Sequence, residues 1–219
     1  MRNDECLRRM AAGVRGERVS EQEWVRRARA GDEAAFTPLV ETYNTAIYNL
    51  CYRMLGEAWE AEDAAQETFL RAYSQLHGYD PARSFKTWLF SIASHHCIDR
   101  LRKRRLTWLS IEDEQLPPHP ALREQTPGPE EQSVRREQSE VIQAMLAKLA
   151  PEDRNVIVMR YWYDYSYEEI ARTTGATVSA VKSRLHRARG YVAEMLKAAN
   201  AKSPRSTGRP ALAVEGLKR

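Results

Sequence analysis

Residues 166–189 read SYEEIARTTGATVSAVKSRLHRAR, and this stretch predicts two helices joined by a tight turn. Ser166 and Glu169 have the spacing of a capping box, in which the two side chains satisfy free backbone N–H groups at the start of a helix. Gly175 marks the turn, because glycine accepts backbone φ angles that other residues avoid. Thr177 is of the residue type that caps the start of a second helix.

The second of these helices has one apolar side and one cationic side. Apolar residues recur at spacings of three and four, which places them on the buried face of a helix: Val178, Val181, Leu185, Ala188, Val192 and Met195. The opposite face presents Lys182, Ser183, His186 and Arg187, while Arg184 and Arg189 lie further round the helix. No acid occurs between Val178 and Tyr191, so the outer face suits the major groove of duplex DNA. The alternative is an ordinary helical hairpin with a solvated basic face.

Another cationic helix is predicted upstream, over residues 84–104. Winding the sequence at about 100° per residue brings Trp88, His95, Asp99 and Arg102 within an arc of about 60°. An aromatic ring beside cations suits unpaired bases, because the ring stacks on a base while the cations hold the backbone. The candidates for binding single-stranded DNA are Phe85, Lys86, Trp88, His95 and Arg102. For Phe85 and Trp88 the alternative is a place in the hydrophobic core.

The helix predicted before it, over residues 57–76, has the opposite charge. Its acids all precede its first base, Arg71, and they are Glu57, Glu60, Glu62, Asp63 and Glu67. Such a face repels DNA. It is either a solvated acidic surface or a docking face for a basic protein partner.

The whole chain has 219 residues and a formal net charge of +4, so the placement of charge is more informative than its total. No apolar run approaches the roughly 20 residues of a membrane span, and the arginine-rich first 20 residues lack the apolar stretch of a secretory signal. Cys6, Cys51 and Cys97 are odd in number and far apart, which argues against a disulfide framework and for a reducing compartment. We therefore expect a cytoplasmic protein.

Helical periodicity without strand alternation predicts an all-α fold. Two small helical domains, the C-terminal one a helix-turn-helix, are joined by a linker that contains five of the ten prolines and six acids against one base. Such a segment cannot bury enough apolar surface to fold alone. The predicted boundaries are an N-terminal extension at 1–19, a first domain at 20–105, the linker at 106–132, a second domain at 133–199 and a basic tail at 200–219. Both terminal segments are expected to be mobile.

Four motifs occur in a fixed order along the chain: DAAQETF at 63–69, FKTWL at 85–89, YSYEEIA at 165–171 and VKSRLHRAR at 181–189. This ordered set closely resembles bacterial RNA polymerase sigma factors of the extracytoplasmic-function (ECF) subfamily, over about residues 21–196. The resemblance implies two helical domains with no middle domain between them. It also implies a protein that initiates transcription by binding rather than by catalysis, with no cofactor and no metal.

The resemblance further implies a role for each surface. The residues that dock on the clamp helices of core RNA polymerase are Asp63, Gln66, Glu67 and Phe69, and the polymerase flap is a second implied contact. Residues 77–105 capture and melt the −10 element, and the helix-turn-helix reads the −35 element. Lys182, Ser183, His186 and Arg187 then face bases, while Arg184 and Arg189 lie near phosphates. The implied partners are core RNA polymerase, promoter DNA as duplex and single strand, and an anti-sigma factor.

One position departs from the family pattern. His95 stands where the family usually has asparagine, in the pocket for a flipped −10 base. The acidic linker has two interpretations, a segment that threads polymerase channels until RNA displaces it, or a simple tether.

Two other functions are compatible with parts of the sequence. A helix-turn-helix regulator that acts without polymerase explains residues 166–189, but neither the acidic helix nor the arc around Trp88. An enzyme would need convergent side chains. His95, His96 and Cys97 are adjacent on a helix, so they point about 100° apart and cannot share one metal ion.

Overall fold

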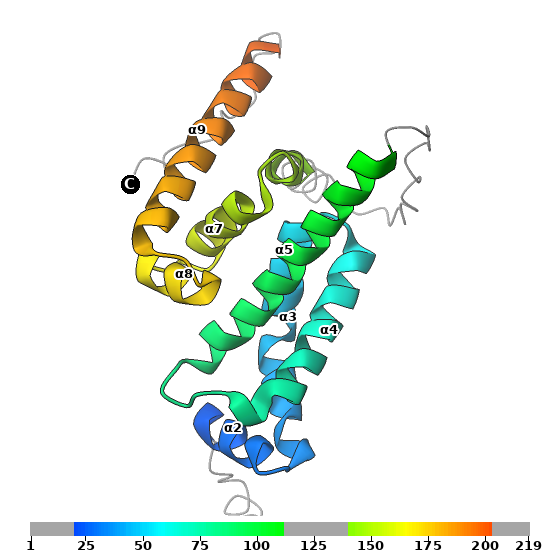
Figure 1. Ribbon diagram of the computed structural model, residues 1–219, viewed down its shortest axis with the longest axis vertical. Coiled ribbons are helices and arrows are strands. Elements are labelled where there is room, and N and C mark those ends of the chain that lie inside the picture. Colours follow the sequence, from blue (N-terminus) through cyan, green and yellow to red (C-terminus); the bar gives the residue numbers. More distant parts are fainter. Residues whose placement is uncertain (1–19, 112–139, 203–219) are drawn as a thin grey trace, which may run out of the picture.

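The computed structural model describes residues 20–111 and 140–202, with side chains over 20–105 and 140–197. Every regular element in these ranges is helical, which confirms the all-α prediction (Figure 1). The elements are α2 (Glu21–Arg29), η1 (Glu33–Ala35), α3 (Thr37–Leu55), α4 (Ala58–Gln75), η2 (Leu76–Gly78), α5 (Phe85–Ile111), α7 (Pro151–Trp162), α8 (Tyr167–Thr174) and α9 (Val178–Lys202). Residues 140–147 are also helical. The N-terminal extension, most of the linker and nearly all of the tail lie outside the described residues.

The first domain is a bundle of α3, α4 and α5, with α2 against one end (Figure 1). Its core is built from apolar residues at helical spacing, including the fully buried Ile47, Leu50, Leu89 and Phe90. The helix α4 contributes the small buried residues Ala61, Ala64, Ala65 and Ala72 to this core. The helix α5 continues to Ile111, past the position where the sequence places the start of the linker.

The second domain has the predicted helix-turn-helix geometry. Glu169 donates its backbone N–H to the Ser166 hydroxyl at 3.1 Å, and Ser166 donates its own N–H to the Glu169 carboxylate at 2.8 Å. This reciprocal pair is the predicted capping box at the start of α8. Gly175 has a φ of 66°, the left-handed value that the turn requires. The Thr177 hydroxyl accepts the N–H of Ala180 at 3.2 Å and caps α9.

The two domains contact one another along α5. The helices α7 and α8 pack on α5, and α7 also packs on α3 (Figure 1). The Phe90 ring lies 4.8 Å from the Tyr163 ring and 5.7 Å from the Tyr165 ring, measured between centroids. The Tyr163 hydroxyl donates to the carbonyl of Ala46 at 2.8 Å. These contacts make a closed arrangement in which the helix-turn-helix is held against the first domain.

A buried cation adds to this interface. Arg154 of α7 donates to the carbonyl oxygen of Met54 at the end of α3. Burial, together with the nearby cation of Arg104, lowers the pKa of Arg154 to about 10. Loss of this hydrogen bond would leave both the buried guanidinium of Arg154 and the carbonyl of Met54 without a partner, which costs free energy of folding.

Candidate nucleic-acid and protein interfaces

The outer face of α9 is a cationic surface. Lys182, Ser183, His186 and Arg187 are all exposed, while Val181, Leu185 and Ala188 on the opposite side are buried. Arg184 and Arg189 are half-buried at the edges of this face. The structure thus brings the four predicted base-facing residues to one surface, with the flanking arginines beside it. Such a face has the donors and the shape to enter a major groove.

Two of these cations are held by neighbouring helices. Arg187 donates from Nε to one carboxylate oxygen of Asp153 at 3.0 Å, and from Nη2 to the other at 2.7 Å. This hydrogen-bonded carboxylate raises the pKa of Arg187. The ammonium of Lys182 lies 5.8 Å from the centroid of the Tyr167 ring on α8. The orientation of the cationic face is therefore set partly by α7 and α8.

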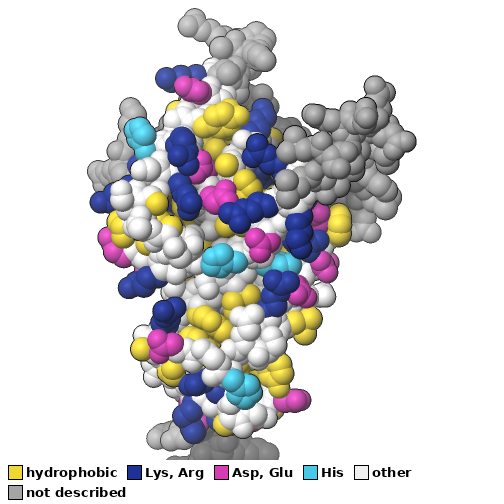
Figure 2. Space-filling view, in the orientation of Figure 1, with side chains coloured by type: hydrophobic (Ala, Val, Ile, Leu, Met, Phe, Trp, Pro, Cys, Tyr) yellow, Lys and Arg dark blue, Asp and Glu magenta, His cyan; other side chains and the backbone are white. Residues whose placement is uncertain are grey.

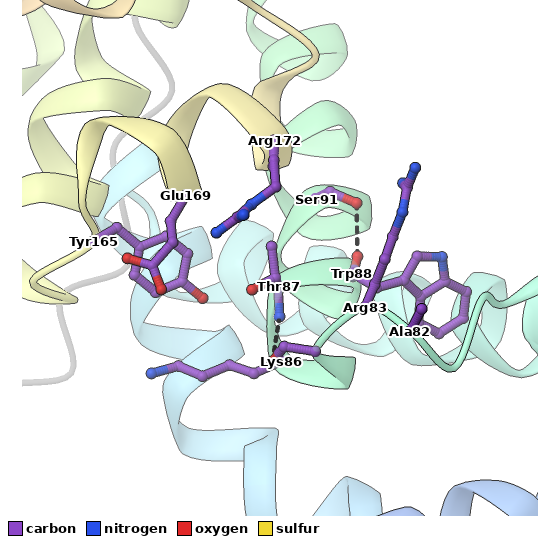
Figure 3. Close-up of a pocket in the computed structure, with 10 residues that line it drawn as sticks. Ala82, Arg83, Lys86, Thr87, Trp88, Ser91, Tyr165, Glu169 and Arg172 are labelled. Atoms are coloured by element: carbon purple, nitrogen blue, oxygen red, sulfur yellow. Dashed lines mark hydrogen bonds between the residues drawn. The ribbon is translucent and has the colours of Figure 1, made fainter. Parts of the chain in front are cut away.

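A cavity of about 440 Å³ lies where the start of α5 meets the second domain (Figure 3). It is lined by Ala82, Arg83, Ser84, Lys86, Thr87, Trp88, Ser91, Tyr165, Glu169 and Arg172. Tyr165, Glu169 and Arg172 lie on one side of it, and Trp88 and Arg83 on the other (Figure 3). The ammonium of Lys86 lies 5.4 Å from the Tyr165 ring centroid. Predicted single-strand residues therefore share this cavity with the helix-turn-helix.

Trp88 is half-buried in an aromatic cluster at the edge of this cavity. Its ring lies 4.9 Å from Tyr79 and 5.6 Å from Phe85, between centroids. Phe85 itself is buried, so of its two interpretations, a DNA contact or a place in the hydrophobic core, the second one applies in this structure. Its ring contacts the Trp88 ring and is almost inaccessible to solvent in this arrangement.

His95 and Arg102 lie further along α5. His95 is exposed, and its Nδ1 donates to the Ser91 carbonyl at 2.7 Å. Arg102 is also exposed, but it donates to Glu152 of the second domain. Trp88 and Lys86 are thus brought together at the cavity, whereas Arg102 is engaged elsewhere.

The three neighbours His95, His96 and Cys97 occupy three different environments. His95 is exposed, His96 is half-buried and Cys97 is fully buried. Over the described residues, no cluster of three or more His, Cys, Asp or Glu side chains is placed to hold a metal ion.

The outer face of α4 combines acids with two large apolar side chains. Glu62, Asp63 and Gln66 are exposed, and so are Trp59 and Leu70, at 66% and 65% of their full accessible surface. An exposed aromatic amid polar residues is typical of a protein interface. Trp59 and Leu70 were not among the residues predicted to form this surface. Their spacing of eleven, about three helical turns, is the signal that would have placed them on the acidic face.

Phe69 points the other way. It was assigned to polymerase binding with Asp63, Gln66 and Glu67, but only 9% of it is accessible and it belongs to the hydrophobic core. Its neighbour Leu70 occupies the outer face.

The acids of α4 are partly neutralised by the basic end of α5. Arg100 pairs with Asp63 and Arg104 pairs with Glu60. Within α4, Glu67 pairs with Arg71 at 2.6 Å. On the face drawn in Figure 2, basic and acidic side chains are interspersed rather than gathered into two areas. The two helices of opposite charge therefore share one surface.

His96 lies beneath this paired surface. Burial lowers the pKa of its imidazole, and the cations of Arg71 and Arg100 lower it further. Neutral His96 thus fits between the ion pairs without adding a third cation to them.

Comparisons with known proteins cover both domains. Residues 39–107 match the family model "Sigma-70 region 2", and residues 139–191 match the model "Sigma-70, region 4". The chain is 38% identical over 177 residues to "ECF RNA polymerase sigma factor SigW" of Bacillus subtilis. That match spans 79% of this chain and 95% of the relative.

Two solved structures have a similar fold. CnrH in complex with the cytosolic domain of CnrY matches with a TM-score of 0.59 and 26% identity, over 84% of this chain and 99% of CnrH. The sigma factor RpoE in complex with the anti-sigma factor NepR, from Bartonella quintana, matches with a TM-score of 0.56 and 23% identity, over 74% of this chain and 96% of RpoE. In the part of the chain whose structure is described, no helix is both long and apolar enough to cross a bilayer.

Proposed function

The chain belongs to the ECF subfamily of RNA polymerase sigma factors, and from this premise we propose how its surfaces divide the work of transcription initiation. As a member of this family, it directs RNA polymerase to begin transcription. We assign polymerase docking to α4, single-stranded DNA to the first turns of α5, and duplex reading to α9. The matches to regions 2 and 4 support a first domain over 20–105 and a second over 133–199.

The observation that carries the proposal is the one-sided character of α9. Lys182, Ser183, His186 and Arg187 are exposed to solvent, and the middle of the apolar stripe, Val181, Leu185 and Ala188, is buried on the side where α9 packs against α7 and α8. Because α9 packs on α7 and α8 through its apolar side, its cationic side is left exposed to solvent and is available to DNA. We assign Lys182, Ser183, His186 and Arg187 to base edges of the −35 element, and Arg184 and Arg189 to its phosphates.

Docking on polymerase is assigned to the outer face of α4. Aromatic side chains such as tryptophan are among the few residues that dominate binding energies at interfaces, and neighbouring apolar contacts help to exclude water from them. Trp59 and Leu70 would supply the apolar contacts, and Asp63, Gln66 and Glu67 the polar rim. The buried Phe69 would act by keeping this helix face in place.

Holding the opened strand is assigned to Trp88, Lys86, His95 and Arg102. An indole ring stacks on an unpaired base at a gain of about 1–3 kcal/mol, and cations hold the backbone. Extruding a base from a duplex costs a few kcal/mol. A few such contacts are therefore enough to favour the open strand without nucleotide hydrolysis, and we propose a binding protein rather than an enzyme.

The closed arrangement has to open on a promoter. Elements at −10 and −35 are about 25 base pairs apart, which is about 85 Å of B-DNA at about 3.4 Å per base pair. Yet Lys86 and Trp88 share a cavity with Glu169 and Arg172 of the helix-turn-helix domain. One domain cannot hold the −10 strand while the other reads the −35 duplex in this conformation. We propose that binding to polymerase separates the two domains, which uncovers the cavity residues of α5 and lets each domain reach its own promoter element.

The partners that follow are core RNA polymerase, promoter DNA and an anti-sigma factor. The structural relative RpoE is bound to the anti-sigma factor NepR, which supports the last of these. We place the chain in the cytoplasm, where bacterial polymerase and DNA are found. A regulator that acts without polymerase would leave the exposed Trp59 and Leu70 on the outer face of α4 without a role, so the comparisons and this face both disfavour it.

Transcription in vitro tests the proposal. Core polymerase free of other sigma factors is mixed with the chain and with fragments of the genome that encodes it, and transcript starts are sequenced. We expect defined start sites preceded by two shared sequence elements. The proposal fails if no defined start arises, or if the starts are unchanged when the chain is omitted.

A further inference from the structure

Arg187 has one edge turned inward and one turned outward. Its Nε and Nη2 donate to the two carboxylate oxygens of Asp153 at 3.0 and 2.7 Å. The two residues lie on different helices, α7 and α9, and 34 positions apart in sequence. The Asp153 side chain is 11% accessible and the Arg187 side chain 66% accessible. The nearly buried carboxylate of Asp153 therefore holds the exposed guanidinium of Arg187 at the surface of the second domain.

The geometry of the pair leaves a defined set of donors for DNA. A guanidinium has five N–H groups in a rigid plane. The edge formed by Nε and Nη2 is occupied by Asp153. The adjacent edge, formed by Nη1 and the second N–H of Nη2, carries two parallel donors. In the major groove, guanine presents two neighbouring acceptors, O6 and N7, whereas adenine presents one acceptor beside a donor.

Resting on the proposed function, we infer that Asp153 is a positioning residue that directs the outer edge of Arg187 at a guanine in the −35 duplex. Asp153 does not touch DNA. It limits the side-chain freedom that Arg187 would otherwise lose on binding, and such preorganisation favours the ligand that matches the fixed geometry. The fixed edge therefore contributes to sequence specificity and not only to attraction for phosphate.

The competing interpretation is that the pair only stabilises the second domain. The two interpretations differ in what a change at Asp153 does. A structural role lowers stability or weakens binding to every sequence alike. A positioning role lowers the preference for guanine at one base pair and leaves the other positions unchanged.

The experiment selects promoters with the holoenzyme, assembled from core polymerase and the full chain. A library with a randomised −35 element is bound, recovered and sequenced for the wild type, R187A, R187K and D153N. D153N keeps the size of the side chain but replaces the bidentate anion by a neutral amide. E152Q is the matched control, since it removes a charge from the adjacent residue, whose side chain pairs with Arg102 instead.

We expect the wild type to enrich guanine at one position and R187A to abolish that enrichment. R187K keeps the charge but lacks the planar fork, so it should also lose the preference. D153N should reduce it by about tenfold at the same position, a typical loss for a weakened bidentate contact. E152Q should leave it unchanged. D153N combined with R187A should be no worse at that position than R187A alone.

The inference is overturned if D153N retains the guanine preference, whether or not it lowers thermal stability. It is also overturned if R187K, a surface change that spares the buried carboxylate, reads guanine as well as the wild type does. A wild-type holoenzyme that enriches no sequence would instead overturn the proposed function, and this inference with it.

Discussion

Arg102 of α5 donates from Nε to a carboxylate oxygen of Glu152 on α7 at 3.0 Å, and so joins the two domains. Arg102 is a residue that we assign to the opened promoter strand. In the closed arrangement its positive charge is directed at a protein carboxylate, which occupies the place of a phosphate. The affinity of the chain for single-stranded DNA should therefore report whether the Arg102–Glu152 contact between the domains is closed or open.

Glu152→Gln should raise the affinity of the chain for single-stranded DNA. The change releases Arg102 and removes a negative charge that repels the strand. Exposed ion pairs contribute only about 0–1 kcal/mol to stability, so the unfolding midpoint should barely move. Fluorescence anisotropy with a labelled oligonucleotide measures the affinity. Glu23→Gln is the control, because it breaks the Glu23–Arg26 pair within α2. Equal affinities for the wild type and E152Q would contradict the assignment of Arg102.

Tyr163→Phe should loosen the contact between the domains. It removes the hydrogen bond to the Ala46 carbonyl, at a cost of about 0.5–1.5 kcal/mol, because that carbonyl lies inside α3 and keeps its helical hydrogen bond. The aromatic contact with Phe90 is kept. Small-angle scattering should show a larger radius of gyration for the variant, and chemical denaturation a lower stability. Unaltered scattering and stability would show that this hydrogen bond does not hold the closed arrangement.

Trp88 and Phe85 should respond differently to truncation, although they touch. Phe85→Ala empties a buried site and should cost about 3–5 kcal/mol of folding free energy. Trp88→Ala removes a half-buried ring and should cost less. It should nevertheless reduce promoter opening, which permanganate reactivity of unpaired thymines at the start site reports. A Trp88→Ala holoenzyme with normal reactivity would place strand capture elsewhere.

Trp59→Ala and Leu70→Ala should each weaken binding to core polymerase by about tenfold or more, the effect expected of an interface hot spot. Both side chains are largely exposed, so thermal stability should be nearly unchanged. Titration of labelled chain against core polymerase measures the affinity. Val141→Ala, another exposed apolar residue but outside α4, is the control. If the control and the α4 variants bind alike, the docking face lies on another surface.

His96→Gln should flatten the dependence of stability on pH. Burial and two nearby arginines lower the pKa of His96 from its ordinary value of 6.5. Below pH 6.5, His96 takes up a proton more readily in the unfolded chain than in the folded chain. The free energy of unfolding of the wild type therefore falls as the pH drops towards about 5. Urea denaturation from pH 7 to about pH 5 measures the slope. His77→Gln, at an exposed site, serves as the control. The prediction is wrong if H96Q and the wild type lose stability in parallel.

Much of the fold follows from local patterns. The capping box at Ser166, the left-handed Gly175 and the apolar stripe of α9 each involve residues within a few positions of one another, so the sequence alone predicts them. The outward direction of Lys182 and His186 follows as well, because helical periodicity relates buried and exposed faces directly.

The pairings between helices had no such signal. Asp153 faces Arg187, Arg100 faces Asp63 and Phe90 faces Tyr163 because the packing of the core brings distant segments together. A charge pattern along one helix does not indicate which helix will lie beside it. The local sequence therefore determined the elements and their faces, as well as the motifs of the family. Only tertiary packing decided which cations are already held by carboxylates and that Phe69 is buried while Trp59 and Leu70 are exposed. The physical reason is that helix formation depends on neighbours in sequence, whereas ion pairs and core contacts depend on neighbours in space.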